Sequence, residues 1–341
     1  MTEKKYVLVT GGAGYIGSHT VLALINNGYE PVILDDYRNA KRDVPNRLEQ
    51  IADRKIEVVE GNCQDAALLE KLGQNYKFWG VIHFAADKAV GESVQDPLKY
   101  YDNNLTSLLS ILNFMKQFEI KNIVFSSSCT VYGEPENPIV TEQTPLAPPA
   151  SPYGATKLLC EQILNDVYKG SPSFKVVALR YFNPVGAHPT GLIGEEPQGI
   201  PNNLMPYITQ TAHGLRKELT VFGNDYDTED GTCLRDYIHV VDLAEAHVAA
   251  FDYLEGQKDE FYDVFNVGTG VGTSVKACID LFAKVTGKEI PFKYGPRRAG
   301  DVPQIFAKVD KARDALKWEA KHDVAYAIET AWNWEQMKDS F

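Results

Sequence analysis

The chain has 341 residues, of which 44% are hydrophobic and 23% charged, and its formal net charge is -12 at pH 7. This balance is typical of a folded globular protein, and the negative charge disfavours nucleic acid or an anionic membrane surface as the main partner. Five cysteines without a C-x-x-C pair favour reduced thiols. Because the chain starts with a strand pattern and has no long apolar run, we expect an unprocessed, cytoplasmic protein that does not cross a membrane.

A glycine-rich segment directly follows the first apolar run, residues 6–9, and precedes a helix expected at 15–27. Its glycines, which fit both G-x-G-x-x-G and G-x-x-G-x-x-G, are Gly11, Gly12, Gly14 and Gly17. Glycines between a strand and a helix permit a tight turn and let backbone N–H groups approach a pyrophosphate. The segment therefore predicts a dinucleotide-binding loop.

The second apolar run, 31–34, ends at Asp35, about 20 residues beyond the glycines. A carboxylate at this position accepts hydrogen bonds from ribose hydroxyls and repels a 2′-phosphate, so NAD is favoured over NADP. The nearby Arg38, Lys41 and Arg42 weaken this inference, unless they form only a solvated basic turn.

Strands and helices alternate regularly in the first half of the chain. Further strands are expected at 56–59, 79–84 and 122–125, and helices at 64–74 and 97–118. This alternation predicts an α/β fold with a doubly wound parallel sheet of the Rossmann type, in which ligands bind at the carboxyl ends of the strands. The residues expected at those ends are Asn62, Phe84, Ala85 and Lys88.

The pattern changes after residue 182, where a loop rich in Gly, Pro and Asn runs to about residue 205. We expect a smaller C-terminal α/β lobe that binds the substrate, with helices at 240–255, 273–286, 310–317 and 323–338. Arg235 and Arg298 suit a diphosphate, because an acidic protein needs local cations to hold one; surface ion pairs are the alternative. No metal-ligand spacing is found.

The segment 151–157 (SPYGATK) places Tyr153 and Lys157 four residues apart, on one face of a helix. A free tyrosine has a pKa of about 10, so a phenol that acts as a base at pH 7 needs a shift of roughly 3 units. A lysine cation at about 5 Å supplies roughly 3 kcal/mol, and a second cation, such as an oxidised nicotinamide, would supply similar help. The pair therefore predicts a tyrosine base for hydride chemistry.

A run of hydroxyl side chains, 126–133, follows the strand at 122–125 and falls where the cleft is expected. A Ser or Thr hydroxyl both donates and accepts, so it can relay a proton between a substrate hydroxyl and the phenol. Ser128 is the first choice for this relay and Thr130 the second.

Taken together, these segments resemble the extended short-chain dehydrogenase/reductase superfamily and, within it, the UDP-glucose 4-epimerase family. The resemblance covers almost the whole chain. It rests on residues 10–17, 83–93, 100–104, 126–133, 151–157, 180–188, 197–207, 222–230 and 235–240.

The resemblance implies an isomerase of galactose metabolism that interconverts UDP-galactose and UDP-glucose through a 4-keto sugar, with NAD bound throughout. It implies Tyr153 as base, Lys157 as electrostatic partner and ribose ligand, and Ser128 as proton relay. It also implies an NAD-binding domain at 1–182 and a UDP-sugar-binding lobe at 183–341, some elements of which return to the first domain. Family members are commonly homodimers.

Individual binding residues are also carried over from the resemblance. The NAD environment comprises Gly11, Gly12, Ala13, Gly14, Tyr15, Ile16, Gly17, Asp35, Asp36, Asn39, Asn62, Cys63, Phe84, Ala85, Lys88, Asn103, Tyr153, Lys157, Tyr181 and Phe182. The UDP-sugar site comprises Lys88, Ser128, Thr130, Tyr153, Asn183, Asn203, Leu204, Phe222, Arg235, Arg298, Asp301 and Ile305.

Two positions depart from the family pattern. Asn62 stands where members usually carry an aspartate near the adenine, although its amide oxygen can still accept that hydrogen bond. Ile305 stands at a wall position occupied in members by tyrosine or a smaller residue such as cysteine. Because isoleucine is intermediate in size, acceptance of 2-N-acetylated UDP-sugars stays open.

Two other functions were weighed. A nucleotide-sugar dehydratase or decarboxylase would need an acid after the serine run, where this chain has Cys129, Thr130 and Val131. A non-catalytic NAD-binding scaffold would not need Tyr153 or Lys157. The joint presence of base, lysine and relay therefore favours the epimerase.

Overall fold

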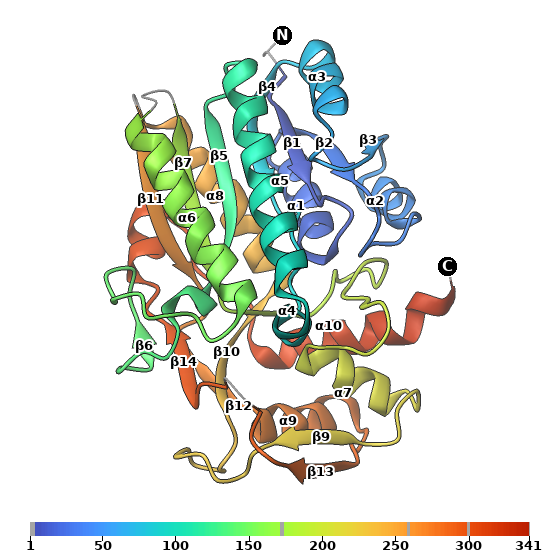
Figure 1. The fold of residues 1–341 in the computed structure, drawn as a ribbon. Helices are drawn as coiled ribbons and strands as arrows, with labels where there is room; N and C mark the ends of the chain where they lie inside the picture. Colours follow the sequence, from blue (N-terminus) through green and yellow to red (C-terminus); the bar gives the residue numbers. More distant parts are fainter. Residues whose placement is uncertain (1–3, 171–173, 258–259, 299–300, 341) are drawn as a thin grey trace.

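A seven-stranded parallel sheet forms the centre of the computed structural model, which describes residues 4–170, 174–257, 260–298 and 301–340. Its strand order is β11-β7-β5-β4-β1-β2-β3, which confirms the doubly wound fold (Figure 1). The strands are β1 (Tyr6–Thr10), β2 (Glu30–Asp35), β3 (Glu57–Glu60), β4 (Phe78–His83), β5 (Asn122–Ser128), β7 (Lys175–Tyr181) and β11 (Phe261–Val267).

Helices cover both faces of this sheet. One face carries α1 (Tyr15–Asn26), α2 (Val44–Ala52) and α8 (Val240–Glu255), and the other α3 (Ala66–Asn75), α5 (Pro97–Gln117) and α6 (Pro152–Gly170). Side chains alternate between the faces, so Val7 and Val9 pack with the first group of helices while Leu8 packs with the second. Burial on both faces explains why these strands are continuous apolar runs.

The order of the strands reverses between β1 and β4, because the chain first builds outward to β3 and then returns to the other side of β1. The carboxyl ends of these two strands therefore diverge into helices on opposite faces. A crevice at this point is where open α/β sheets bind their ligands.

The remaining elements form a smaller unit below the sheet in Figure 1. Its sheets contain β6 (Ile139–Val140), β8 (Asn183–Val185), β9 (Leu219–Phe222), β10 (Leu234–His239), β12 (Gly272–Ser274), β13 (Phe292–Gly295) and β14 (Gln304–Ala307). Its helices are α7 (Leu204–Ala212), α9 (Val275–Thr286) and α10 (Val324–Met337), which share an apolar core. Short helices elsewhere are α4 (Val90–Gln95), η1 (Cys129–Tyr132), η2 (Ala312–Leu316) and η3 (Lys338–Ser340).

Several elements differ from the sequence-based expectation. The helices α2, α4 and α7 were not expected, and the helix expected at 310–317 is a five-residue π-helix, η2. The short α2 packs Val44, Leu48 and Ile51 against the core at helical spacing, a pattern that the sequence-based prediction did not use because the segment is only nine residues long. Parts of 183–341 lie against the first sheet, since β11 pairs with β7 and α8 packs on α1. The division at residue 182 stays a prediction.

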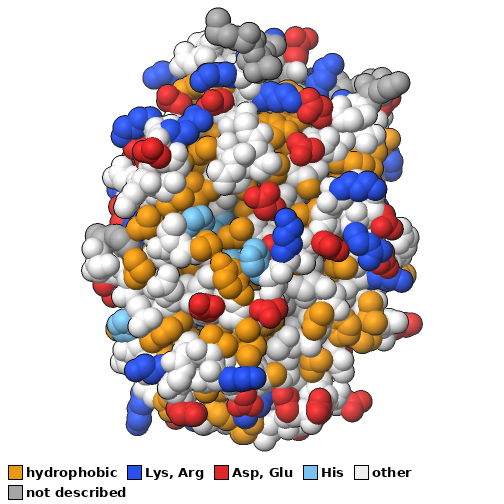
Figure 2. Space-filling view, turned by 180° about the vertical axis from the view of Figure 1, so that it is seen from behind, with side chains coloured by type: hydrophobic (Ala, Val, Ile, Leu, Met, Phe, Trp, Pro, Cys, Tyr) orange, Lys and Arg blue, Asp and Glu red, His pale blue; other side chains and the backbone are white. Residues whose placement is uncertain are grey.

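Charged side chains of both signs are interspersed on the face seen in Figure 2. Among the helices that the structure describes, none is both long and apolar enough to pass through a bilayer.

Candidate functional site

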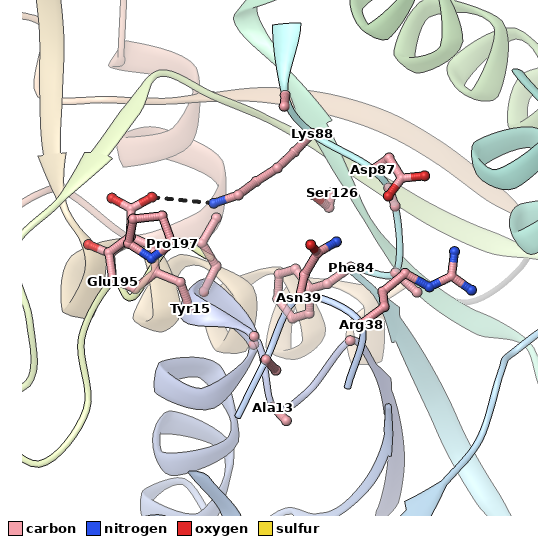
Figure 3. A pocket seen from close by; sticks show the side chains of 18 of the residues that line it. Ala13, Tyr15, Arg38, Asn39, Phe84, Asp87, Lys88, Ser126, Glu195 and Pro197 are labelled. Carbon is pink, nitrogen blue, oxygen red and sulfur yellow. Dashed lines mark hydrogen bonds and ion pairs between the residues drawn. The ribbon is translucent and has the colours of Figure 1, made fainter. Parts of the chain in front are cut away.

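A cavity of about 440 Å³ opens at the carboxyl ends of β1, β2, β4, β5 and β7 (Figure 3). Its other wall is the loop after β8, which contributes residues between Ile193 and Asn203. This volume is within the usual range for small-molecule sites. The described residues contain no group of three or more His, Cys, Asp or Glu side chains that could hold a metal ion.

The glycine loop between β1 and α1 forms the floor of this cavity. Gly11 has a φ of +72°, and a Cβ atom at Gly17 would lie 2.2 Å from the carbonyl oxygen of Gly11. Only glycine fits either position, because the first needs a left-handed backbone and the second needs contact between two backbone segments. Gly12 packs against Val9 and Ile33 and, unlike the other predicted loop residues, does not line the cavity.

Asp35, at the end of β2, connects the glycine loop to the cofactor cleft. Its carboxylate accepts hydrogen bonds from the backbone N–H of Ala13 at 2.9 Å and of Tyr37 at 2.9 Å. Burial raises the pKa of this carboxyl, and the two backbone hydrogen bonds act in the opposite direction. Each oxygen keeps a free lone pair, so the residues present fit a dinucleotide with unmodified ribose hydroxyls.

The three basic residues after β2 are all paired with carboxylates. Arg38 contacts Asp36 at 2.6 Å, Lys41 pairs with Glu196, and Arg42 pairs with Glu60. A 2′-phosphate would have to displace one of these carboxylates to gain a cation. The basic turn therefore does not weaken the case for NAD.

Asn62, which follows β3, lines the cavity. Its side-chain oxygen accepts a hydrogen bond from the backbone N–H of Gln64 at 2.9 Å, and the Gln64 amide reaches the Asn103 carbonyl at 3.3 Å. The asparagine thus forms a local turn and still has one acceptor position available.

The predicted catalytic residues meet where β5 and α6 converge. Ser128 is the last residue of β5, and its hydroxyl accepts from the Thr130 hydroxyl at 3.0 Å. The Lys157 ammonium donates to the Ser126 carbonyl at 2.6 Å and lies 5.9 Å from the centre of the Tyr153 ring. One helical face and one strand end thus bring base, cation and relay together at the cavity wall.

Burial is the largest cause of the pKa shifts of Tyr153 and Lys157. It raises the pKa of Tyr153 to about 12, although a hydrogen bond with Ser128 opposes the shift, and it lowers the pKa of Lys157 to about 8. The lysine alone therefore does not produce the lowered phenol pKa that the spacing suggested. A phenolate at neutral pH requires a further positive charge in the cavity.

Glu195, whose side chain is 10% exposed, is among the cavity carboxylates that sequence reasoning missed. It accepts a hydrogen bond from the Asn203 amide at 2.6 Å and lies 3.4 Å from the Lys88 ammonium (Figure 3). The Trp334 indole donates to its carbonyl at 3.1 Å. Because Glu195 lies in an irregular loop, no periodicity or motif marked it.

Cavity lining separates the predicted UDP-sugar residues into two groups. Lys88, Ser128, Thr130, Tyr153, Asn183 and Asn203 line the cavity, together with every predicted NAD residue other than Gly12. Six others are not among its lining residues: Leu204, Phe222, Arg235, Arg298, Asp301 and Ile305.

The residues outside the lining contact one another. Asp301 pairs with Arg298 at 2.8 Å and with Arg235 at 3.4 Å, while Arg298 lies 5.9 Å from the centre of the Phe222 ring. Ile305 is 6% exposed, belongs to an apolar cluster that also contains Phe182, and is not among the lining residues of the cavity. Residues 299–300 of the predicted polar segment lie outside the described residues.

Comparison with known proteins places the chain in a family. Residues 8–330 match the family described as GDP-mannose 4,6 dehydratase. The chain is 49% identical over 329 residues to UDP-glucose 4-epimerase of Bacillus subtilis, with 96% of both chains covered. It is 48% identical over 346 residues to the human UDP-glucose 4-epimerase, covering 100% of this chain and 98% of the human one.

A solved structure agrees with these relatives. UDP-glucose 4-epimerase from Bifidobacterium longum, in complex with NAD⁺ and UDP, has a TM-score of 0.95 and 46% identity, covering 98% of this chain and 99% of its own. The dehydratase description names the broader family, whereas the full-length relatives are epimerases. The chain therefore belongs to the UDP-glucose 4-epimerase family of the extended short-chain dehydrogenase/reductase superfamily.

Proposed function

We propose that this protein is an NAD-dependent 4-epimerase that interconverts UDP-galactose and UDP-glucose, with Tyr153 as its base. The observation that carries the proposal is the meeting of Tyr153, Lys157 and Ser128 at the wall of the dinucleotide cleft. Membership of the epimerase family supports it, as does the Bifidobacterium relative that binds NAD⁺ and UDP.

The glycine loop and Asp35 would hold the dinucleotide, through backbone N–H groups for the pyrophosphate and the carboxylate for the ribose. When bound, oxidised NAD supplies a hydride acceptor and a second positive charge beside the phenol. Burial raises the pKa of Tyr153 to about 12 even with Lys157 nearby, so the lysine does not ionise the phenol on its own. Ionisation of the base is therefore tied to cofactor loading.

Tyr153 takes the proton of the sugar C4 hydroxyl, with Ser128 as the relay, as C4 becomes a carbonyl. The 4-keto sugar turns over in the site, and the phenol returns the proton to the C4 oxygen as the opposite epimer forms. No proton is gained or lost overall. Thr130, whose hydroxyl donates to Ser128, orients the relay.

For the UDP moiety, we propose Arg235 and Arg298 as diphosphate ligands and Asn183, Asn203, Leu204 and Phe222 as further contacts. Asp301 holds both guanidinium groups, so their binding to a diphosphate requires a rearrangement of this cluster. Bidentate arginine pairing suits phosphate oxygens. Ile305 would limit the sugar pocket from behind Phe182.

A homodimer and a cytoplasmic location remain predictions. A second copy of the chain fits the outer surface of α5 and α6, which lie side by side and uncovered in Figure 1. Leu109 on α5 is 44% exposed and Leu159 on α6 is 37% exposed, which is consistent with burial against a partner. Sedimentation velocity of the purified protein tests this state directly.

The function is tested with purified protein and no added cofactor, by following the 4-epimers of UDP-galactose and, separately, UDP-N-acetylgalactosamine. Conversion of UDP-galactose is expected. If no conversion occurs even with added NAD, the result would instead support a non-catalytic NAD-binding scaffold. Conversion of UDP-N-acetylgalactosamine would mean that the pocket near Ile305 has room for the 2-N-acetyl group. An Ile305→Ala variant, which removes wall volume, should then convert it faster.

A further inference from the structure

Each of the three nitrogen atoms of the Arg38 guanidinium group makes a contact at one end of the cavity. Its Nε donates to Asp36 at 2.7 Å, one terminal nitrogen contacts the same carboxylate at 2.6 Å, and the other donates to Asn103 at 3.0 Å. Asp36 also accepts from the Arg38 backbone N–H at 3.1 Å. The side chain is thus held by Asp36 and Asn103, and a ligand would have to compete with these two partners for its donors.

A second carboxylate, Asp87, faces the same end of the cleft (Figure 3). It is 3% exposed, and its Oδ2 atom has no hydrogen-bond partner among the described residues. The Asn104 side chain fixes its backbone with hydrogen bonds of 2.8 and 3.0 Å. Burial raises the pKa of this carboxyl, whereas the charges of Lys99 and Arg38 lower it, so Arg38 lies in the field of two carboxylates.

A 2′-phosphate carries close to two negative charges and is bound in proteins by an arginine with a free fork of N–H donors. In this cleft the phosphate would be repelled by the carboxylates of Asp35, Asp36 and Asp87. Arg38 is already paired with Asp36. Asp35 alone disfavours the phosphate, but Arg38 would offset that repulsion if it were released.

We infer that Asp36 and Asp87 keep Arg38 away from the ribose 2′ position and thereby strengthen the selectivity of this chain for NAD over NADP. Arg38 is then a latent phosphate ligand, and the two carboxylates are positioning and specificity residues that act through it. The inference rests on the proposed function, because it concerns the dinucleotide of the same site.

Dinucleotide exchange in the purified protein tests this inference. The protein is incubated with excess NADP⁺, separated from free nucleotide, and extracted, and the ratio of bound NADP to NAD is measured by chromatography. Asp36→Asn and Asp87→Asn should each raise this ratio, and the double variant should raise it by about tenfold or more, since the Arg38–Asp36 ion pair is lost and the negative charge of Asp87 is removed. Adding Arg38→Met to the double variant should cancel most of the gain.

Glu60→Gln is the matched control, because it releases Arg42 from its carboxylate at a position outside the cavity lining, and it should leave the ratio unchanged. An unchanged ratio in the double variant, or a gain that survives Arg38→Met, would overturn the inference. If the double variant does not fold, the single variant Asp36→Asn tests the inference. Its side chain is partly exposed, so the substitution should be tolerated by the fold. Wild-type protein that holds neither dinucleotide would instead contradict the proposed function.

Discussion

The dinucleotide end of the cleft is formed largely by backbone, whereas the substrate end is formed by charged side chains that bind one another. At the first end, backbone N–H groups join the glycine loop to Asp35 and to the end of β2. At the second, Asp301 holds Arg235 and Arg298, and neither arginine lines the cavity. The difference suggests that the cofactor site is preorganised, while the substrate site assembles when a diphosphate replaces Asp301.

Both ends meet at Tyr153, so Tyr153→Phe should have the largest effect on turnover. Removal of the phenol is expected to lower kcat by about 10²–10⁴-fold, because the proton of the sugar hydroxyl loses its acceptor. Bound NAD should be unaffected if the cofactor end is preorganised. The control is Tyr168→Phe on the same helix, and full turnover in Tyr153→Phe would refute the mechanism.

Gly17→Ala tests the backbone end alone. The added Cβ atom would overlap the Gly11 carbonyl oxygen, so we expect a loss of about 1–3 kcal/mol in the free energy of unfolding and loss of bound NAD. Urea unfolding and nucleotide extraction measure the two effects. Gly170→Ala is the control, because within the described part of the chain its Cβ position meets no atom within 4 Å beyond its own helix, and equal behaviour of both variants would argue against the close packing of the glycine loop.

Lys157→Met should move the acid limb of the pH profile of kcat to higher pH. The phenol pKa is already raised by burial, and without the ammonium less positive charge remains to oppose that rise. Activity at pH 7 is expected to fall roughly 10–100-fold and to recover as the pH is raised, because Tyr153 then ionises. A profile of unchanged shape would show that the lysine does not act on the phenol.

Arg235→Met tests the side-chain end. Loss of one charged hydrogen-bonding group should weaken UDP binding by roughly tenfold, measured by calorimetry, while bound NAD stays constant. Lys288→Met, an exposed position, is the control. If NAD is lost together with UDP affinity, the two ends are not independent.

The smallest effect is expected at Glu195, which joins the two ends through Lys88 and Asn203. Glu195→Ala should raise the KM for UDP-galactose about fivefold with little change in kcat, because Asn203 loses its fixed orientation. Glu195→Gln should be intermediate, since an amide oxygen can still accept from Asn203. A kcat effect larger than the KM effect would instead place Glu195 in the chemical step.

The sequence predicted the cofactor end better than the substrate end for a physical reason. Strand, glycine loop and helix are consecutive, so their geometry follows from local rules for Gly11 and Gly17. The position of Arg235 depends instead on pairing of β10 with β8, β12 and β14, which come from distant parts of the chain. Ile305 shows the same limit, because its burial in an apolar cluster is a packing result that residue size does not reveal.

By itself, the sequence determined the alternation of strands and helices, the dinucleotide loop, and the spacing that places Tyr153 and Lys157 on one helical face, since each depends on residues close in the chain. Only the tertiary structure decided the pKa values of the site residues and the hydrogen-bond and ion-pair partners of its charged side chains. Burial raises the pKa of Tyr153 to about 12, and Arg38, Glu195 and Asp301 find partners across loops or between elements. Desolvation and long-range pairing depend on what surrounds a group in space, which periodicity and spacing do not contain.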